Sequence, residues 1–153
     1  MTDDWQIHGE ERPLPALLGE LKERALEELH ARLGDEGYPD IRPGHGCVFR
    51  FIEVEGSRLT QIAGRAGMTK QTVGEVVADL EGLGYLERVP DPEDGRAKII
   101  RLSARGWDAQ AAALRIFADI ERRWARAVGD EPVAELRKTT EAILASELAV
   151  VGN

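Results

Sequence analysis

The chain has 153 residues, of which 42% are hydrophobic and 31% charged, and its formal net charge is −8. This length suits one domain or a small module with added helices, and the composition excludes a disordered chain. No apolar run approaches the roughly 18 residues of a membrane-spanning helix, and the acidic N-terminus differs from a signal peptide. We therefore expect a cytoplasmic protein with no membrane partner.

The acidic charge is unevenly distributed along the chain. Between Ser57 and Arg105 there are eight basic and seven acidic residues, a net charge of +1, so the other residues carry −9. Proteins that contact nucleic-acid phosphates usually present a basic surface. The charge of this block therefore permits DNA binding, whereas that of the other residues disfavours it.

The N-terminal part is predicted to contain a mobile arm, a long helix and a short one. Residues 1–12 are polar and charged, which is typical of a loosely held arm. Apolar residues recur every three or four positions from Pro13 to Leu33, which indicates an amphipathic helix that ends at Gly34. Glycines and prolines predict a loop over Asp35–Gly46, and a short helix follows over His45–Glu53.

The central part is predicted to form a helix-turn-helix. Thr60 is the expected N-cap of a short helix that stops at Gly67, and Thr69 is the expected N-cap of a longer helix that Gly82 and Gly84 end. The longer helix carries one apolar stripe, formed by Val73, Val76, Val77, Leu80 and Leu83.

Two β-rich runs follow, Tyr85–Val89 and Ala97–Leu102, and the Asp94-Gly95 step between them is a strong turn signal. A helix-turn-helix followed by a hairpin is the order of a winged helix-turn-helix, whose second helix can enter a DNA major groove. We therefore predict a mostly α fold with a small β-hairpin wing.

The C-terminal part is predicted to form two helices. Ser103 is the expected cap of the first, which runs to about Val128, and Pro132 lies early in the second. Together with the N-terminal helix they carry more apolar surface than one small module can cover. We expect this surface to join two copies of the chain, and packing within one chain is the alternative.

The block from Leu59 to Gly106 resembles the multiple-antibiotic-resistance regulator (MarR) family of winged-helix transcription factors. Five features in register carry the resemblance: Met68-Thr69, Leu80-Glu81, Gly84-Tyr85-Leu86-Glu87-Arg88, Asp91-Pro92-Glu93-Asp94-Gly95-Arg96, and Leu102-Ser103 with Gly106. The resemblance implies a homodimer that binds a near-palindromic operator on double-stranded DNA. It implies a sequence-specific transcriptional regulator, a repressor released by a small aromatic or phenolic effector.

The resemblance also divides the chain into four parts. These are an N-terminal arm at 1–12, a dimerisation helix and loop at 13–42, a winged helix-turn-helix module at 43–103, and C-terminal dimerisation helices at 104–153. The expected DNA-binding residues lie on the recognition helix and the wing, and they are Thr69, Lys70, Gln71, Thr72, Gly74, Glu75, Asp94, Arg96 and Lys98.

Arg96 is the strongest of these candidates, because the family places an arginine of the wing tip in the minor groove, whose negative potential attracts a guanidinium. Asp94 is expected to orient it by a charge-assisted hydrogen bond. A plain surface ion pair is the alternative for this pair, and solvated polar positions are the alternative for the recognition helix.

Three positions depart from the family pattern. Gly74 stands where a hydroxyl residue is common, Glu75 where a basic residue is common, and Gly95 where a second basic wing residue is common. Glu75 repels phosphate unless it accepts a hydrogen bond from a cytosine amine or faces a neighbouring cation. With the net charge of −8, these departures leave open a winged-helix module that has lost DNA reading and serves protein interaction or dimerisation.

A cleft between the dimer helices and the wing module is the expected effector site, with Cys47, Arg50, Phe51 and Trp107 as its candidate residues. Cys47 is read as a small apolar residue, with a redox sensor as the alternative. The three histidines are dispersed without ligand spacing, so no metal or other cofactor is expected. The sequence lacks a P-loop, a nucleophile elbow and a helix with paired metal ligands, so we expect no enzyme.

Overall fold

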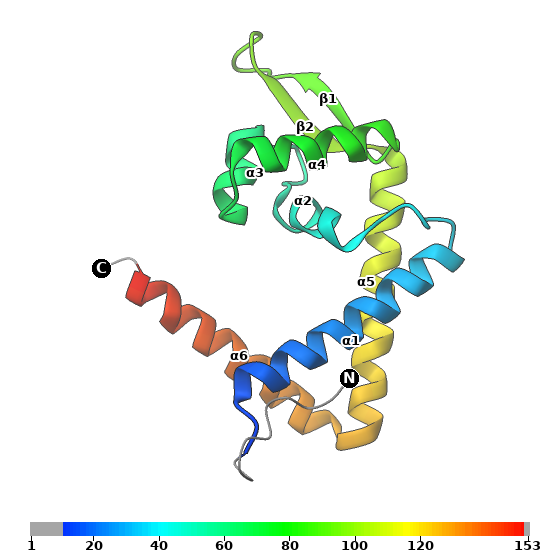
Figure 1. Ribbon diagram of the computed structural model, residues 1–153, viewed down its shortest axis with the longest axis vertical. Coiled ribbons are helices and arrows are strands. Elements are labelled where there is room, and N and C mark those ends of the chain that lie inside the picture. The colour runs from blue at the N-terminus through cyan, green and yellow to red at the C-terminus, as the bar shows by residue number, and fades with distance from the viewer. Residues whose placement is uncertain (1–10, 152–153) are drawn as a thin grey trace. The chain divides into compact units, whose positions relative to one another are not determined.

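The computed structural model describes residues 11–151, so all but the last two residues of the predicted arm lie outside the described part. The described elements are, in chain order, α1 (Leu14–Asp35), the 3₁₀ turn η1 (Pro43–His45), α2 (Gly46–Phe51), α3 (Leu59–Ala66), α4 (Lys70–Gly82), β1 (Leu86–Pro90), β2 (Lys98–Leu102), α5 (Ala104–Val128) and α6 (Asp130–Val151) (Figure 1). The predicted fold class, mostly α with one β-hairpin, is confirmed.

Helix α1 ends at Asp35, one residue beyond the predicted stop at Gly34. The chain leaves the helix at Gly37, whose φ of +102° lies in the left-handed region that favours glycine. The N–H of Tyr38 then donates to the carbonyl of Leu33 at 2.8 Å, which satisfies a carbonyl at the end of the helix. Gly34 itself stays helical.

The caps of the winged-helix module were predicted in part. Thr69 caps α4 as expected, because its hydroxyl accepts the N–H of Thr72 at 3.2 Å. The predicted cap at Thr60 is wrong. Helix α3 begins at Leu59, and its N-cap residue is Arg58, whose N–H donates to the side-chain oxygen of Gln61 at 2.9 Å.

Apolar side chains of α2, α3, α4 and β2 form the core of the module. The predicted stripe of α4 is largely confirmed, because Val73, Val77 and Leu80 are fully buried, and Val48, Ile62 and Ile100 join them. Burial of one such side chain stabilises a fold by about 1.5–3 kcal/mol. This core fixes one face of α4 and leaves the opposite face exposed.

Strands β1 and β2 pair antiparallel, with Leu86 opposite Leu102 and Pro90 opposite Lys98. We call the two strands and the turn between them the wing. Strand β1 starts one residue later than predicted, because Tyr85 is a fully buried residue at the junction before the strand. An isolated bridge between Ser57 and Ile100 holds the wing to the start of α3.

Tyr85 joins the end of α4 to the start of α5. Its N–H donates to the carbonyl of Leu80 at 2.9 Å, and its carbonyl accepts the N–H of Ser103 at 3.0 Å. Ser103 caps α5 as predicted, because its hydroxyl oxygen accepts the N–H of Gly106 at 3.1 Å. Its hydroxyl also donates to the carbonyl of Gly84 at 2.5 Å. Helix α4 is thus connected to the start of α5 by the hydrogen bonds of Tyr85 and Ser103.

The Tyr85 side chain lies among polar and aromatic partners. Its hydroxyl donates to the carboxylate of Asp40 and accepts from the Arg105 guanidinium at 3.0 Å. The ring centroids of Tyr38 and Phe49 lie 6.3 Å from its own. Burial, with the hydrogen bond to Asp40, raises the pKa of Tyr85 above its ordinary value. The phenol is therefore neutral over the physiological range.

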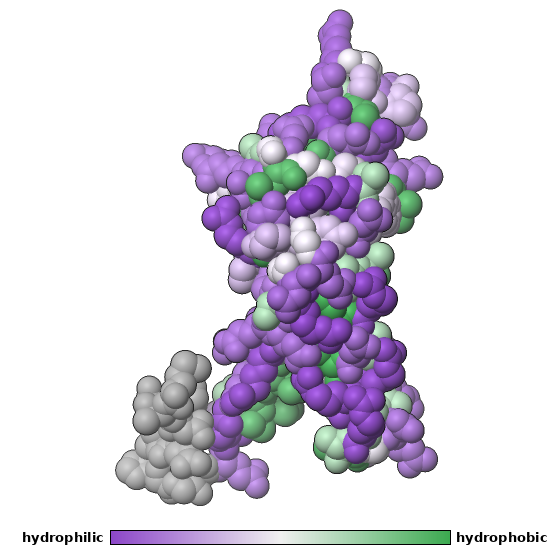
Figure 2. Space-filling view, turned by 90° about the vertical axis from the view of Figure 1, so that its right-hand side faces the viewer, coloured by the Kyte–Doolittle hydropathy of each residue, from purple (hydrophilic) through white to green (hydrophobic). Residues whose placement is uncertain are grey.

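Packing divides the chain into two compact units, residues 1–114 and residues 115–153, with the division inside α5. In the second unit Ile116 and Ile120 are buried, whereas α6 exposes Leu136, Ile143, Leu144, Leu148 and Val150. Exposed apolar residues appear green in Figure 2. No helix within residues 11–151 has the length and apolar character needed to cross a membrane. The predicted four-part division of the chain stays a prediction.

Two glycines give a matched test of packing. A Cβ at Gly106 would overlap the carbonyl oxygen of Tyr85, whereas a Cβ at Gly74 would make ordinary contact with Leu59 Cδ2 at 3.6 Å. We predict that Gly106→Ala lowers the free energy of unfolding by about 1–3 kcal/mol. Gly74→Ala should raise it by about 0.5–1 kcal/mol, because glycine costs more entropy in a helix. Urea unfolding at one protein concentration checks both, and an unchanged midpoint for Gly106→Ala contradicts the first.

Candidate nucleic-acid interface

The N-terminal turn of α4 is exposed, as a recognition helix requires. Lys70 and Gln71 are exposed, and so are Thr69 and Thr72, whose hydroxyl oxygens lie 2.8 Å apart. Because Thr69 Oγ1 also accepts the N–H of Thr72, the two hydroxyls form a small network at the start of the helix. Their side chains are therefore ordered next to the position where a phosphate could approach.

The next two predicted positions on α4 differ in their surroundings. Gly74 is half-buried, and a Cβ built on it would face Leu59 of α3, whereas Glu75 is exposed. A side chain at position 74 would therefore point toward α3, while one at position 75 points into solvent. Of these two departures from the family pattern, only Glu75 therefore places a side chain on the exposed face of α4.

The wing tip holds Asp94, Arg96 and Lys98 on its surface. The carboxylate of Asp94 accepts the main-chain N–H of Arg96 at 3.1 Å, and its carbonyl accepts the N–H of Ala97 at 2.9 Å. Within residues 11–151 no hydrogen bond joins Asp94 to the Arg96 guanidinium, so the predicted orienting bond is wrong. An Asp side chain readily binds the main chain two residues on, which orders the turn and leaves the guanidinium unheld.

The base of the wing is held by a contact that the sequence did not predict. Asp91 is 7% exposed, and its Oδ2 accepts hydrogen bonds from Nε and a terminal nitrogen of Arg58 at 2.9 and 2.5 Å. Its Oδ1 accepts the N–H of Glu93 at 2.9 Å. An Asp side chain commonly accepts the main-chain N–H two residues on, so the sequence contained a signal for the turn at Asp91. It contained no signal for the contact with Arg58, which lies 33 residues away.

A second unpredicted contact holds the C-terminal half of α4. His45 is 4% exposed, and its Nδ1 accepts the N–H of Arg42 at 2.9 Å, so Nε2 carries the proton and donates to Asp79 at 2.5 Å. The Arg42 guanidinium donates to the same carboxylate oxygen at 2.9 Å. The bonds from His45 and then Arg42 hold the pKa of Asp79 below its ordinary value. Helix α4 is thereby tied to the segment before α2.

Ion pairs sort the basic residues of the module into two groups. Five of the eight between Ser57 and Arg105 are paired: Arg58 with Asp91 (2.5 Å), Arg65 with Glu53 (2.6 Å), Arg88 with Glu81 (3.1 Å), Arg101 with Glu87 (2.6 Å) and Arg105 with Asp40 (3.7 Å). Across residues 11–151, no ion pair involves the other three, Lys70, Arg96 and Lys98. These three cations lie on the recognition helix and the wing, and phosphate can bind them without breaking a pair.

The four candidate effector residues all lie in the first unit. Cys47 is half-buried and its thiol donates to the carbonyl of Gly44 at 3.4 Å. The Arg50 guanidinium lies 4.9 Å from the centroid of the half-buried Phe51 ring. Trp107 is 41% exposed on α5. Their role in binding an effector stays a prediction.

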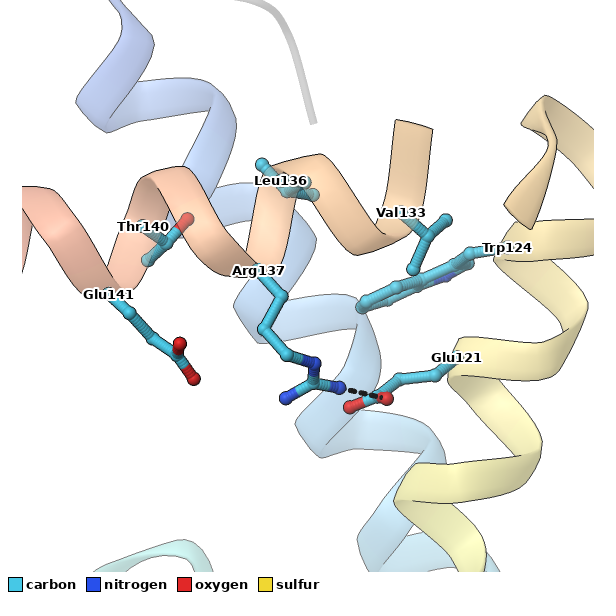
Figure 3. A pocket seen from close by; sticks show the side chains of 7 residues that line it. All are labelled: Glu121, Trp124, Val133, Leu136, Arg137, Thr140 and Glu141. Carbon is cyan, nitrogen blue, oxygen red and sulfur yellow. Dashed lines mark hydrogen bonds and ion pairs between the residues drawn. The ribbon is translucent and has the colours of Figure 1, made fainter. Parts of the chain in front are cut away.

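A pocket in the second unit lies between α5 and α6 (Figure 3), and its lining residues are Glu121, Trp124, Val133, Leu136, Arg137, Thr140 and Glu141. The Trp124 ring lies beside Val133, and an ion pair between Arg137 and Glu121 borders the opening. None of the predicted site residues lines this pocket.

The fold and the exposed face of α4 with its wing define a winged helix-turn-helix protein. Residues 40–97 match the model of the MarR family. The transcriptional regulator HosA of Escherichia coli O111:H- is 29% identical over 110 residues, which are 71% of this chain and 82% of HosA. The resemblance to the MarR family that the sequence predicted is therefore confirmed, and the family model covers residues 40–97 of the chain.

Solved structures share the fold. The MepR–DNA complex of S. aureus superposes with a TM-score of 0.68 at 21% identity, covering 89% of this chain and 99% of that one. CouR from Rhodococcus jostii RHA1, bound to p-coumaroyl-CoA, superposes with a TM-score of 0.62 at 23% identity, covering 83% of this chain and 88% of that one.

The hydrogen bonds that Asp91 accepts from Arg58 and from the N–H of Glu93, which we call the clamp, predict that stability depends on pH. The N–H of Glu93 and then Arg58 hold the pKa of Asp91 below its ordinary value. As the pH falls, the unfolded chain takes up this proton first, so the stability is present above about pH 4 and is lost below it. We predict that Asp91→Asn lowers the melting temperature at pH 6 and flattens its fall between pH 4 and pH 2.5.

Thermal melts across this pH range measure the effect. Glu93→Gln is the control, because this exposed side chain in the same turn accepts no hydrogen bond within residues 11–151. It should melt like the unmodified protein. An equally steep acid dependence for Asp91→Asn would exclude a contribution from the clamp.

Proposed function

We propose that the chain is a homodimeric, sequence-specific DNA-binding transcriptional regulator, with α4 entering the major groove and the wing reaching the minor groove. The observation that carries this function is the position of the unpaired cations of the module. Lys70 opens the recognition helix, and Arg96 and Lys98 lie on the wing. These are the two elements that a winged helix presents to DNA.

Each cation has a role that its chemistry supports. Lys70 suits a phosphate or a guanine acceptor, and Lys98 suits a phosphate. Arg96 is proposed to enter the minor groove, where a narrow groove concentrates negative potential. The Asp94 turn holds the main chain of Arg96 and leaves its guanidinium available. The MepR–DNA structure, of the same fold, supports DNA as the partner.

The dimer is proposed to form through the apolar residues left exposed on the terminal helices. Leu14 and Leu17 of α1 are 58% and 43% exposed, and Leu144 and Leu148 of α6 are 57% and 75% exposed. Apolar side chains in such numbers are typical of an association surface. A two-fold dimer would place two recognition helices about 34 Å apart, which suits a near-palindromic operator.

Regulation is proposed to be repression, relieved by a small aromatic or phenolic effector near Cys47, Arg50, Phe51 and Trp107. Two proteins of this fold support such a ligand, since CouR was solved with p-coumaroyl-CoA and MepR with ethidium bromide. An effector can act only if it binds the DNA-competent and released forms with different affinity. Release of a bound duplex on adding aromatic acids or phenols tests this part of the proposal.

The alternative function is a winged-helix module for protein interaction, and one measurement distinguishes it from a DNA-binding regulator. A DNA-reading regulator should bind a random fluorescent duplex at low salt and lose it as salt rises, because bound phosphates release counterions. Absence of binding at low salt would favour the alternative.

Arg96 and Arg101 form a matched pair on the wing. Arg96 is unpaired, whereas Arg101 is held by Glu87 at 2.6 Å. We predict that Arg96→Ala weakens binding to a selected operator duplex by about 1–3 kcal/mol, because it removes a groove contact. Arg101→Ala should change the affinity far less. Fluorescence anisotropy measures both, with sedimentation confirming that each variant stays dimeric; equal affinities for Arg96→Ala and the unmodified protein would refute the wing contact.

The dimer surface is tested on α6. We predict that Leu144→Glu gives monomers at micromolar concentration, because burying a carboxylate at an interface costs several kcal/mol. Lys138→Glu, at an exposed polar position about 120° around the same helix from Leu144, should stay dimeric. Sedimentation velocity distinguishes the two, and a dimeric Leu144→Glu protein would place the interface elsewhere.

A further inference from the structure

The acidic residues of the module, like its basic ones, fall into two groups. Five of the seven between Ser57 and Arg105 accept hydrogen bonds from a side chain or the main chain: Asp79, Glu81, Glu87, Asp91 and Asp94. Within residues 11–151 the carboxylates of Glu75 and Glu93 accept none. Glu93 lies near the wing tip and Glu75 lies on the recognition helix.

Glu75 occupies the middle of the exposed stripe of α4. Residues at i, i+4, i+7 and i+11 share one face of a helix, and here they are Gln71, Glu75, Ala78 and Gly82, all exposed. Ala78 and Gly82 have little or no side chain, so the helix can approach a groove closely along this stripe. Glu75 is then the longest side chain in the second half of the face that DNA would meet.

A carboxylate in this position repels phosphate and needs a hydrogen-bond donor on the bases. In the major groove cytosine presents the N4 amino donor, whereas guanine presents acceptors and thymine presents an acceptor and a methyl group. Adenine presents its N6 amino donor beside the N7 acceptor, which repels a carboxylate. The base edge that fits Glu75 best is therefore cytosine.

We infer that Glu75 is a specificity-determining residue that accepts a hydrogen bond from the N4 amino group of one cytosine in each half-site of the operator. The inference depends on the proposed function, because it requires α4 to lie in the major groove. It turns a residue that opposes non-specific DNA binding into one that favours a particular base pair. Glu75 thus weakens binding to most duplexes and spares those with a C·G pair at the correct position.

The experiment is selection of bound duplexes from a random pool with four full-length proteins: the unmodified chain, Glu75→Ala, Glu75→Gln and Glu93→Gln. The unmodified chain should select one cytosine per half-site that Glu75→Ala no longer selects. Glu75→Gln should shift the preference at that position toward adenine, which a glutamine binds through both N6 and N7. A purely structural role of Glu75 would not exchange one base for another.

Affinity measurements give the size of the effect. On a duplex in which the selected C·G pair of one half-site is replaced by T·A, the unmodified chain should bind about tenfold more weakly, as expected for one good base contact. Glu75→Ala should bind the two duplexes equally. Glu93→Gln, the matched control, should strengthen binding to both duplexes alike and select the same sequence as the unmodified chain.

Two outcomes would overturn the inference, and they differ in what they say of the proposed function. If the unmodified chain selects a consensus that both Glu75 variants retain, Glu75 acts only by repelling phosphate, while the proposed function stands. If the unmodified chain binds no duplex at low salt, the proposed function fails and the assignment of Glu75 fails with it.

Discussion

The recognition helix keeps its place because one buried residue, Tyr85, is bonded to three segments at once. Its main-chain groups join the end of α4 to the cap of α5, and its hydroxyl joins both to Asp40 in the loop after α1. Such buried bonds are costly to leave unmade. The Arg105 guanidinium, 4.8 Å from the Tyr85 ring centroid, holds the same side chain from α5. A movement of the first turn of α5 would therefore reach α4 without passing through a flexible linker.

Charge pairing lets an acidic chain keep a surface suited to DNA. Most basic residues of the module form ion pairs with nearby carboxylates. The unpaired basic residues lie on α4 and the wing. Charges farther than about 8 Å from a phosphate are largely screened at physiological salt. The net charge of −8 therefore weighs less than the local arrangement of Lys70, Arg96 and Lys98. With few phosphate contacts, affinity would depend more on base contacts than in a strongly basic protein.

Local features of the structure followed from the sequence, and long-range ones did not. The caps at Thr69 and Ser103 were predictable, because a hydroxyl bonds the N–H three residues on. The cap at Arg58 was missed because its signal lies in Gln61, at the third helical position, while Thr60 offered a more familiar residue type. The bonds of Arg58 to Asp91 and of His45 to Asp79 join residues more than 30 positions apart. No periodicity records such pairs, although they fix the wing base and α4.

The departures from the family pattern acquire different meanings once their surroundings are known. Gly74 faces α3, so its missing side chain weakens the helix and removes little from the groove face. Among residues 11–151 no atom lies within 4 Å of a Cβ built at Gly95, so a side chain there would have had room on the wing tip. Of the three departures, only Glu75 adds a charge, and it lies on the face of α4 opposite the core. A side chain that raises the free energy of every complex lacking its partner base contributes to specificity, because discrimination depends on differences between complexes and not on the strength of any one.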